Sequence, residues 1–420
     1  MKQSQSNRSV FKQTQPQKKF TVAGVRNCIL IVIFALYLAA AFVFVVVLPK
    51  DEASGQKENR TLASFPEFSF QRLFDGEFTS EFETYLSDNV GYRSVFTDIA
   101  SVYNSNKGIS SFGKIVETQG DLGTGSTTDS RLVVTEDKVM EVYDLNEEAR
   151  EKYIEMVNFY AEKLPQEINL YAMLMPTQID FLPMYNTVGD SERESINYFY
   201  ENFSDRVHSI DVYDTLKEHY DNGEYVYFRT DHHWTTLGAY YAYNKMSGEM
   251  GIPSLDINNF EQCESDDFLG YLYNQAQEPR LANHKDIIYY YKNYMNDIPF
   301  SCVTYSYVPG ERFDYSGKIF NPELGATYNL FMGGDQPFID ISTAAGTNKT
   351  LLMIKDSYSN ALIPWLACGY SKILVIDART FDQKITDILA QYPVDDFLIT
   401  NYIIGTNFTD YIELCHQIYE

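Results

Sequence analysis

TLLMIKDSYSNALIPWLACG, residues 350–369, is the stretch that decides the fold. It opens with an apolar strand candidate, Thr350–Ile354, and passes through the polar residues KDS into a helical stretch. A second apolar strand candidate is Asn169–Met175, and helical patterns cover Glu147–Lys163 and Thr236–Glu249. Because strands that alternate with helices form parallel sheets, the sequence predicts an α/β domain.

Ser357 follows the strand of this stretch directly. A strand, a tight turn and a helix N-terminus together expose a serine hydroxyl at the carboxyl edge of a sheet, where open α/β sheets bind ligands. Backbone amides and the helix dipole can stabilise an oxyanion there. Lys355 and Asp356 stand where many nucleophile turns have glycine. The alternative is that Ser357 or Ser359 only caps the helix.

A second segment, YVYFRTDHHWTTLGAYY at 225–241, concentrates titratable groups. Asp231, His232, His233 and Trp234 are expected between a short aromatic strand and a helix. An imidazole can act as a base near neutral pH while a carboxylate fixes its tautomer. In the Asp-x-His spacing Asp231 can turn back toward His233, which makes His233 the better candidate base. The alternative is a set of capping and packing residues.

The two segments together offer a nucleophile, a base and an orienting acid, in the residues Ser357, His233 and Asp231. They predict a serine hydrolase-like site without a metal or cofactor. The competing hypothesis is metal-dependent phosphoester hydrolysis, because Asp231, His232 and His233 could bind Mn²⁺ or Zn²⁺. Such enzymes need further aspartates, and no Asp-x-Asp pattern precedes the motif.

Composition limits the class of partner. The chain has 420 residues, of which 45% are hydrophobic, and a formal net charge of -25. Nucleic acid is excluded as a partner, because phosphate binding needs clustered Lys and Arg. The cysteines are widely spaced without a C-x-x-C pair. We expect free thiols, with a Cys263–Cys302 disulfide as the alternative.

Near the N-terminus, Cys28–Leu48 is an uninterrupted stretch without a charge. It is long enough to cross a bilayer core of about 30 Å, so a single transmembrane helix is predicted over residues 27–48. Basic residues precede it and acids follow it, which predicts a cytoplasmic tail at 1–26 and an extracellular remainder at the cell membrane. A cleaved signal peptide is the alternative, but the apolar run is too long for one.

Three further segments are expected after the membrane helix. Residues 49–105 form a linker and a helical segment, in which Phe78, Phe82 and Tyr85 have helical spacing. Residues 106–420 form the α/β domain. Within it, the section at about 255–345 is rich in Tyr and in turns, and is expected to be an insertion or a set of long loops over the sheet.

Two short motifs, TDHHWT at 230–235 and IKDSYSN at 354–360, resemble the DHHW family. This family is similar to the SGNH-hydrolase-like proteins that O-acetylate alginate and other bacterial exopolysaccharides. ENRTLASFPEF at 58–68, GEFTSEFETYLSDNVGYR at 76–93 and ILVIDART at 373–380 extend the resemblance. It covers roughly residues 58–410.

The resemblance implies an SGNH-hydrolase-like, flavodoxin-like parallel sheet with flanking helices. Asp231 and His233 match its Asp-x-His element, and Ser357 matches its nucleophile. The implied activity is O-acetylation of a cell-surface or secreted polysaccharide through an acyl-Ser357 intermediate. A carbohydrate esterase with the same triad is the alternative, because only the acceptor differs. The implied acyl donor is a membrane-bound O-acyltransferase.

Other residues adjoin the motifs and are expected either to contact substrate or to support the site: His232, Trp234, Arg229, Tyr358 and Arg379. A further hypothesis from another class is a non-catalytic glycan-binding module, in which tyrosines such as Tyr289–Tyr291 stack on sugars. Retention of all three triad residues counts against it.

Overall fold

The computed structural model describes residues 22–47, 64–88, 114–121, 127–185, 187–295, 299–305 and 312–419. The predicted tail up to residue 21 and the predicted linker at 49–60 lie outside these ranges. The chain divides into two compact units. The first takes Met1–Gln56 and Thr61–Phe96, and the second takes Lys57–Arg60 and Thr97–Glu420.

The first unit contains helices α1 (Val22–Val47), α3 (Phe70–Phe74) and α4 (Glu77–Asp88). The predicted membrane span falls within α1, whose described side chains are those of residues 26–38. Among the residues that the structure describes, no helix is long and apolar enough to cross a membrane, so that prediction is unsupported here. In α4 the rings of Phe78 and Phe82 stack with centroids 5.7 Å apart, as their helical spacing predicts.

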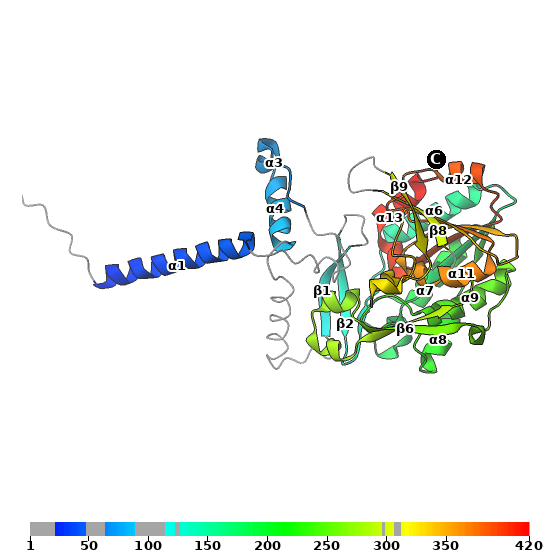
Figure 1. The fold of residues 1–420 in the computed structure, drawn as a ribbon, viewed down its shortest axis with the longest axis horizontal. Coiled ribbons are helices and arrows are strands. Elements are labelled where there is room, and N and C mark those ends of the chain that lie inside the picture. The colour runs from blue at the N-terminus through cyan, green and yellow to red at the C-terminus, as the bar shows by residue number, and fades with distance from the viewer. Residues whose placement is uncertain are drawn as a thin grey trace, which may run out of the picture. The chain divides into compact units, whose positions relative to one another are not determined.

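The second unit is built on a mixed sheet, whose described strands have the order β5-β4-β13-β11-β12-β10-β8-β9. The strands of the sheet, in chain order, are β4 (Asn169–Met175), β5 (Val207–Ser209), β8 (Pro299–Tyr305), β9 (Arg312–Lys318), β10 (Phe338–Ser342), β11 (Thr350–Lys355), β12 (Lys372–Ile376) and β13 (Asp396–Tyr402). Figure 1 shows this sheet between two layers of helices.

The prediction of a parallel sheet is correct for one half and wrong for the other. β5, β4, β13, β11 and β12 run parallel to one another. β10 pairs antiparallel with both β12 and β8, and β9 continues the sheet antiparallel. These three strands lie wholly in the section at 255–345, which was expected to be an insertion or a set of long loops over the sheet. Its strands instead satisfy their backbone groups by extending the edge of the sheet.

Helices cover both faces of the sheet. Those of the second unit are α6 (Glu147–Lys163), α7 (Glu192–Asn202), α8 (Tyr213–Asp221), α9 (Thr236–Met250), α10 (Tyr271–Ala276), α11 (Ile363–Gly369), α12 (Ile385–Gln391) and α13 (Thr409–Gln417). α6 packs against α13, while α9 packs against α8 and α11. In Figure 1 these two groups lie on opposite sides of the sheet, which is the arrangement that right-handed crossovers produce.

The decisive stretch of the sequence lies in the core. All six residues of β11 are buried, and β13 is buried along its whole length between β11 and β4. Strands that are covered on both faces need continuous apolar runs, which is why β11 and β4 were readable from the sequence, whereas β13 was not predicted. The predicted helices Glu147–Lys163 and Thr236–Glu249 are also confirmed, the second extending to Met250.

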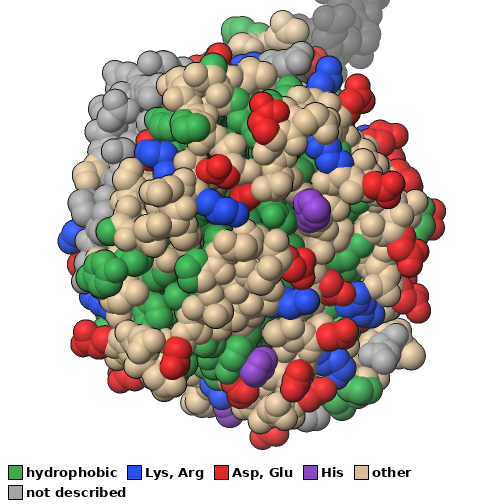
Figure 2. Space-filling view, turned by 90° about the vertical axis from the view of Figure 1, so that its right-hand side faces the viewer, with side chains coloured by type: hydrophobic (Ala, Val, Ile, Leu, Met, Phe, Trp, Pro, Cys, Tyr) green, Lys and Arg blue, Asp and Glu red, His purple; other side chains and the backbone are tan. Residues whose placement is uncertain are grey.

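Two smaller sheets complete the second unit. β1 (Lys114–Asp121), β2 (Thr127–Val134) and β3 (Val139–Glu141) form an antiparallel meander. β6 (Glu261–Phe268) pairs with the Tyr-rich β7 (Asp286–Lys292). Cys263 on β6 is free, so the alternative disulfide is not formed. Figure 2 shows acidic side chains spread over one face of the molecule and gathered along one edge, in keeping with the net charge of -25.

Candidate active site

The histidine loop, residues 230–235, is preceded by a buried segment that does not form the expected strand. Tyr227 makes only an isolated bridge with Trp234. The segment pairs instead with the loop itself, because Thr235 donates its N–H to the carbonyl of Val226 at 2.9 Å. Its aromatic residues Tyr227 and Phe228 are buried in the core, which explains why its composition resembles that of a strand. The loop ends where Thr235 caps α9 by accepting the N–H of Gly238.

The serine turn, residues 355–358, joins β11 to a short 3₁₀ helix, η7 (Ser357–Ala361), which leads into α11. Asp356 has an extended backbone with φ -102° and ψ -177°, so no glycine is needed at this position. Its carboxylate caps η7 by accepting the N–H of Tyr358. The turn lies at the carboxyl ends of the parallel strands, and Ser357 is partly exposed there.

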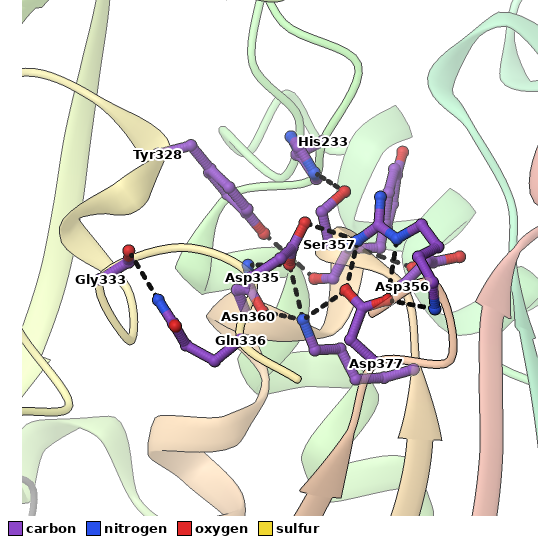
Figure 3. Close-up of polar contacts among 12 residues, drawn as sticks. His233, Tyr328, Gly333, Asp335, Gln336, Asp356, Ser357, Asn360 and Asp377 are labelled. Carbon is purple, nitrogen blue, oxygen red and sulfur yellow. Dashed lines mark hydrogen bonds and ion pairs between the residues drawn. The ribbon is translucent and has the colours of Figure 1, made fainter. Parts of the chain in front are cut away.

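The fold brings the three predicted site residues into one chain of hydrogen bonds. His233 Nε2 lies 2.9 Å from Ser357 Oγ, and His233 Nδ1 lies 2.6 Å from Asp231 Oδ1. Asp231 and His233 are each 3% exposed, in contrast to the partly exposed Ser357. Figure 3 shows the imidazole directed at the serine hydroxyl. A proton can therefore move from a reactive hydroxyl to a buried base that a carboxylate orients.

Asp231 is held as an ion. Burial opposes its charge, but His233, His232 and two backbone N–H groups together hold the pKa of this carboxyl well below its usual range. Those N–H groups belong to His233, at 3.0 Å, and to Tyr271, at 2.8 Å. Gly270 lies so close that a Cβ added to it would come 2.5 Å from Asp231 Oδ2. The start of α10 thus orients the acid of the triad.

The ring of His233 is fixed by an aromatic residue that the sequence did not single out. Tyr328 is buried and its ring stacks on the imidazole, with centroids 3.7 Å apart and an interplanar angle of 11°. Its hydroxyl donates to the carbonyl of Tyr358 at 3.0 Å, and the indole N–H of Trp234 donates to the same carbonyl at 2.8 Å. Tyr358 and Trp234 are therefore interior supports, which join the histidine loop to the serine turn.

His232 packs beside the base instead of pointing away from it. The two imidazole centroids are 3.9 Å apart, and the ring of Tyr271 meets His232 edge-on. Burial, followed by the charge of His233, lowers the pKa of His232 to about 4. Its Nδ1 atom is buried and has no hydrogen-bond partner among the residues that the structure describes. The backbone carbonyl of His232 accepts a hydrogen bond from the hydroxyl of Tyr358, which fixes the loop.

The same three residues are also the metal-ligating group expected under the competing hypothesis. Asp231, His232 and His233 offer ligand atoms that lie within 4.8 Å of one another. A metal ion bound there through His233 Nδ1 would replace the hydrogen bond between that atom and Asp231. Metal binding and the hydrogen-bonded triad therefore exclude each other in this geometry.

Arg379 and Arg229, the remaining predicted residues, differ in where they lie. Arg379 is mostly buried beside the serine turn and bonds to Asp335 and Asp377. Arg229 is exposed and lies over the ring of Tyr225 at 5.1 Å, while its backbone N–H donates to Asp286. No contact of Arg229 with the triad is found in the described part of the chain.

A buried charge network underlies the serine turn (Figure 3). Lys355 is completely buried, and its Nζ lies 2.6 Å from Asp335 Oδ1 and 2.8 Å from the side-chain oxygen of Asn360. Burial opposes the charge of Asp335, but Lys355 and Arg379 hold its pKa well below the usual range. The network ties the turn to the segment that precedes β10.

Comparison with known families adds to this geometry. The model of the family described as "DHHW protein" matches residues 101–376, which include both the histidine loop and the serine turn. The chain belongs to the DHHW family. The resemblance that the two motifs carried is thereby confirmed. No curated protein matches this DHHW chain.

Two solved structures share this fold. A DHHW family protein from Eubacterium siraeum is 25% identical, with a TM-score of 0.59, and the match covers 73% of this chain and 98% of that one. Bacillus cereus PatB1, solved with a sulfonyl adduct, is 18% identical with a TM-score of 0.55, and the match covers 69% and 99% of the two chains. The O-acetyltransferase domain of Pseudomonas putida AlgJ is more distant, at 12% identity and a TM-score of 0.39, over 68% and 98%.

Several residues of this DHHW site were missed in the sequence. Tyr328, Tyr271 and Asp335 lie in the section at 255–345, far from both motifs along the chain. The sequence around them is rich in turns and has no hydrophobic periodicity that would indicate which side chains point inward. Asp356 was considered only as a replacement for glycine. Its position directly before the serine was the available signal, since a carboxylate there can cap the following helix.

Proposed function

We propose that this DHHW protein is a serine acyltransferase that O-acetylates a polysaccharide outside the membrane. The proposal rests on one observation: the hydrogen-bonded chain from Asp231 through His233 to a partly exposed Ser357. Each group has the atom and the distance that nucleophilic acyl transfer requires. The choice of acetyl group and polysaccharide comes from the family resemblance.

In the first half of the proposed reaction, Ser357 Oγ attacks the acyl carbon of the donor. His233 Nε2 takes the hydroxyl proton and passes it to the leaving oxygen of the donor, which leaves the acyl group on Ser357. The imidazolium that forms is stabilised by the ionised Asp231. Ser357 is the first residue of η7, and its own N–H would donate to the negative oxygen, since the N–H groups of Tyr358 and Ser359 are already bonded to Asp356.

In the second half, an acceptor hydroxyl attacks the acyl-Ser357 ester. His233 removes the proton of that hydroxyl and returns it to Ser357 Oγ as the ester bond to serine breaks. A sugar hydroxyl and a water molecule are activated in the same way. Transferase and esterase therefore differ in the acceptor that occupies the site, and the triad alone is compatible with both.

The test uses the purified full chain with a chromogenic acetyl ester, with and without polysaccharide acceptors. Turnover should fall on the order of 10⁴-fold or more in Ser357→Ala and His233→Ala. Ser359→Ala is the matched control, because Ser359 is a buried neighbour that contacts Thr400. Acetylated polysaccharide identifies a transferase, whereas acetate release alone identifies an esterase.

Two results would exclude the serine mechanism. One is activity that survives Ser357→Ala and disappears with a chelator, which would favour the metal site of Asp231, His232 and His233. The other is measurable glycan binding without turnover in any preparation, which would favour a binding module.

The proposal includes a membrane anchor and a membrane partner. The anchor would be the uncharged stretch Cys28–Leu48, with the basic tail in the cytoplasm and the site outside. An extracellular enzyme has no cytosolic acyl donor within reach, so a membrane-bound O-acyltransferase would supply the acyl group. The full chain should stay in membranes after alkaline extraction, and a chain starting at residue 49 should be released. Release of both would remove the anchor from the proposal.

A further inference from the structure

Asp356 lies directly before the nucleophile and is bonded to a different part of the sheet. It is 3% exposed. Its Oδ1 atom accepts the N–H of Tyr358 at 3.0 Å, within the serine turn itself. Its Oδ2 atom accepts the side-chain amide of Asn401 at 3.1 Å and the N–H of Tyr402 at 2.9 Å. One carboxylate therefore joins the serine turn to the carboxyl end of β13.

The neighbouring carboxylates have a different task. Asp335 and Asp377 contact Lys355 and Arg379, and so neutralise the cations beneath the turn. The hydrogen-bond partners found for Asp356 in the described part of the chain are N–H donors. Each of these bonds requires Asp356 to act as an acceptor. Burial raises the pKa of Asp356 to about 6, although the hydrogen bonds from Asn401, Tyr402 and Tyr358 and the charge of Arg379 oppose this shift.

The anchor to which Asp356 is bonded is itself fixed in the core. The side-chain oxygen of Asn401 accepts the hydroxyl of Tyr153 on α6, and its amide also donates to Tyr411 on α13, both at 2.9 Å. Just beyond β13, a Cβ added to Gly405 would come 3.2 Å from Asp356 Oδ2. The carboxylate thus sits in a tight socket formed by the end of β13 and the segment after it.

We propose that Asp356 is the positioning residue of the nucleophile. This inference rests on the proposed function of Ser357. The bonds to Tyr358, Asn401 and Tyr402 fix the backbone on both sides of the turn, and so hold Ser357 Oγ at 2.9 Å from His233 Nε2. Without the carboxylate the turn relaxes, and the hydroxyl is misaligned with its base while the surrounding site stays in place.

The experiment measures how fast an aromatic sulfonyl fluoride modifies the full chain, read by intact mass and peptide mapping. Wild type should be modified at Ser357, and Ser357→Ala should not be. In Asp356→Asn the amide keeps the size of the side chain but turns an NH₂ group toward an N–H donor. We expect the maximal rate to fall about 10²-fold while the half-saturating probe concentration stays unchanged. If wild type is not modified at Ser357, the proposed function fails first.

Asp396→Asn is the matched control, since Asp396 is completely buried on the same strand β13 but at its start. It bonds to Tyr370 at 2.8 Å and to Lys349 at 3.1 Å. We expect lower stability and a wild-type modification rate below the melting temperature. A wild-type rate in Asp356→Asn, or an equal slowing in Asp396→Asn, overturns the positioning role.

Asn401→Leu keeps the experiment decisive if Asp356→Asn does not fold. It removes one bond to Asp356 and leaves the other two. We expect the modification rate to fall less than in Asp356→Asn, again without a change in half-saturation. An unchanged rate in folded Asn401→Leu also overturns the proposal.

Discussion

The side chain of His233 is contacted by residues from segments that are far apart in the sequence. Asp231 is two residues away and bonds Nδ1, Ser357 lies at Nε2, and Tyr328 covers one face of the ring. A base held in this way needs no reorganisation before it accepts a proton. The alignment of His233 with Asp231 and Ser357 is therefore sensitive to small displacements of these residues, most of all where neighbouring atoms are in close contact with them.

Gly270 is one such position. In Gly270→Ala the added methyl group would lie 2.2 Å from Asp231 Cβ, so the loop must shift and Asp231 loses its alignment with His233. We expect ester turnover to fall about 10²-fold, measured beside the melting temperature. Gly248→Ala is the control, because a Cβ there, in the last turn of α9, meets nothing within 4 Å, and alanine should leave turnover unchanged. Wild-type turnover in Gly270→Ala would contradict this account.

His232 predicts a dependence of stability on pH. Its pKa is about 4 in the folded chain, below the ordinary value of 6.5. The unfolded chain therefore binds a proton that the folded chain does not, and stability is lost as the pH falls from 6.5 toward 4.

The change His232→Gln removes this titration. The free energy of unfolding of wild type relative to His232→Gln should therefore decrease between pH 6.5 and 4, by at most about 1.4 kcal/mol per pH unit. Urea unfolding at several pH values measures it. Parallel curves for the two proteins would show that His232 does not carry the effect.

At the scale of elements, the helices and strands that could be predicted are those whose own residues show a hydrophobic pattern. β4, β11, α6 and α9 were readable because continuous apolar runs and helical spacing reflect burial directly. The pairing of β10 with β12 could not be predicted, because the pairing of strands that are distant in the sequence leaves no local sequence pattern. The segment around Tyr227 was misread as a strand since aromatic residues are common both in strands and in buried loops.

The same distinction applies to the site. The sequence predicted Asp231 and His233 because both lie in a dense local pattern, and Ser357 because it follows a strand and belongs to the paired motifs of the family resemblance. The contacts of Tyr328 with His233 and of Asp335 with Lys355 depend on the tertiary fold, in which turns from one section meet strand ends from another.

The end of β11 provides a prediction about buried charge. Lys355 is completely buried against Asp335, so Lys355→Met leaves that carboxylate without one of its two cations. We expect a loss of about 3 kcal/mol in the free energy of unfolding. The matched change on the neighbouring strand is Lys372→Met, whose ion pair with Asp340 is partly exposed and should contribute at most about 1 kcal/mol. Urea unfolding compares the two, and equal losses would contradict the buried network.

At the scale of the whole molecule, the second unit contains the complete site. Every contact described for Asp231, His233 and Ser357 is made by residues between 225 and 402. The large core of this unit is also made from its own strands and helices. The first unit contributes no residue to that core in the described part of the chain.

A chain that starts at Thr97 should therefore fold and react. We expect cooperative thermal unfolding and modification of Ser357 by a sulfonyl fluoride within about twofold of the full-length rate, since local geometry sets that rate. The matching Ser357→Ala fragment serves as the control. A fragment that folds but no longer reacts would mean that the first unit contributes to the site.

The strand order has a consequence for the timing of synthesis. β13 is the last strand in the chain, yet it lies between β4 and β11 in the middle of the sheet. A growing chain that stops before residue 396 lacks the strand at the centre of the sheet, and two of the three donors that bind Asp356, those of Asn401 and Tyr402, have not been made. Asp231, His233 and Ser357 are present in such a chain, but the serine turn lacks its anchor at the end of β13. On the proposed mechanism, we expect unfinished chains to be inert until their final residues are made.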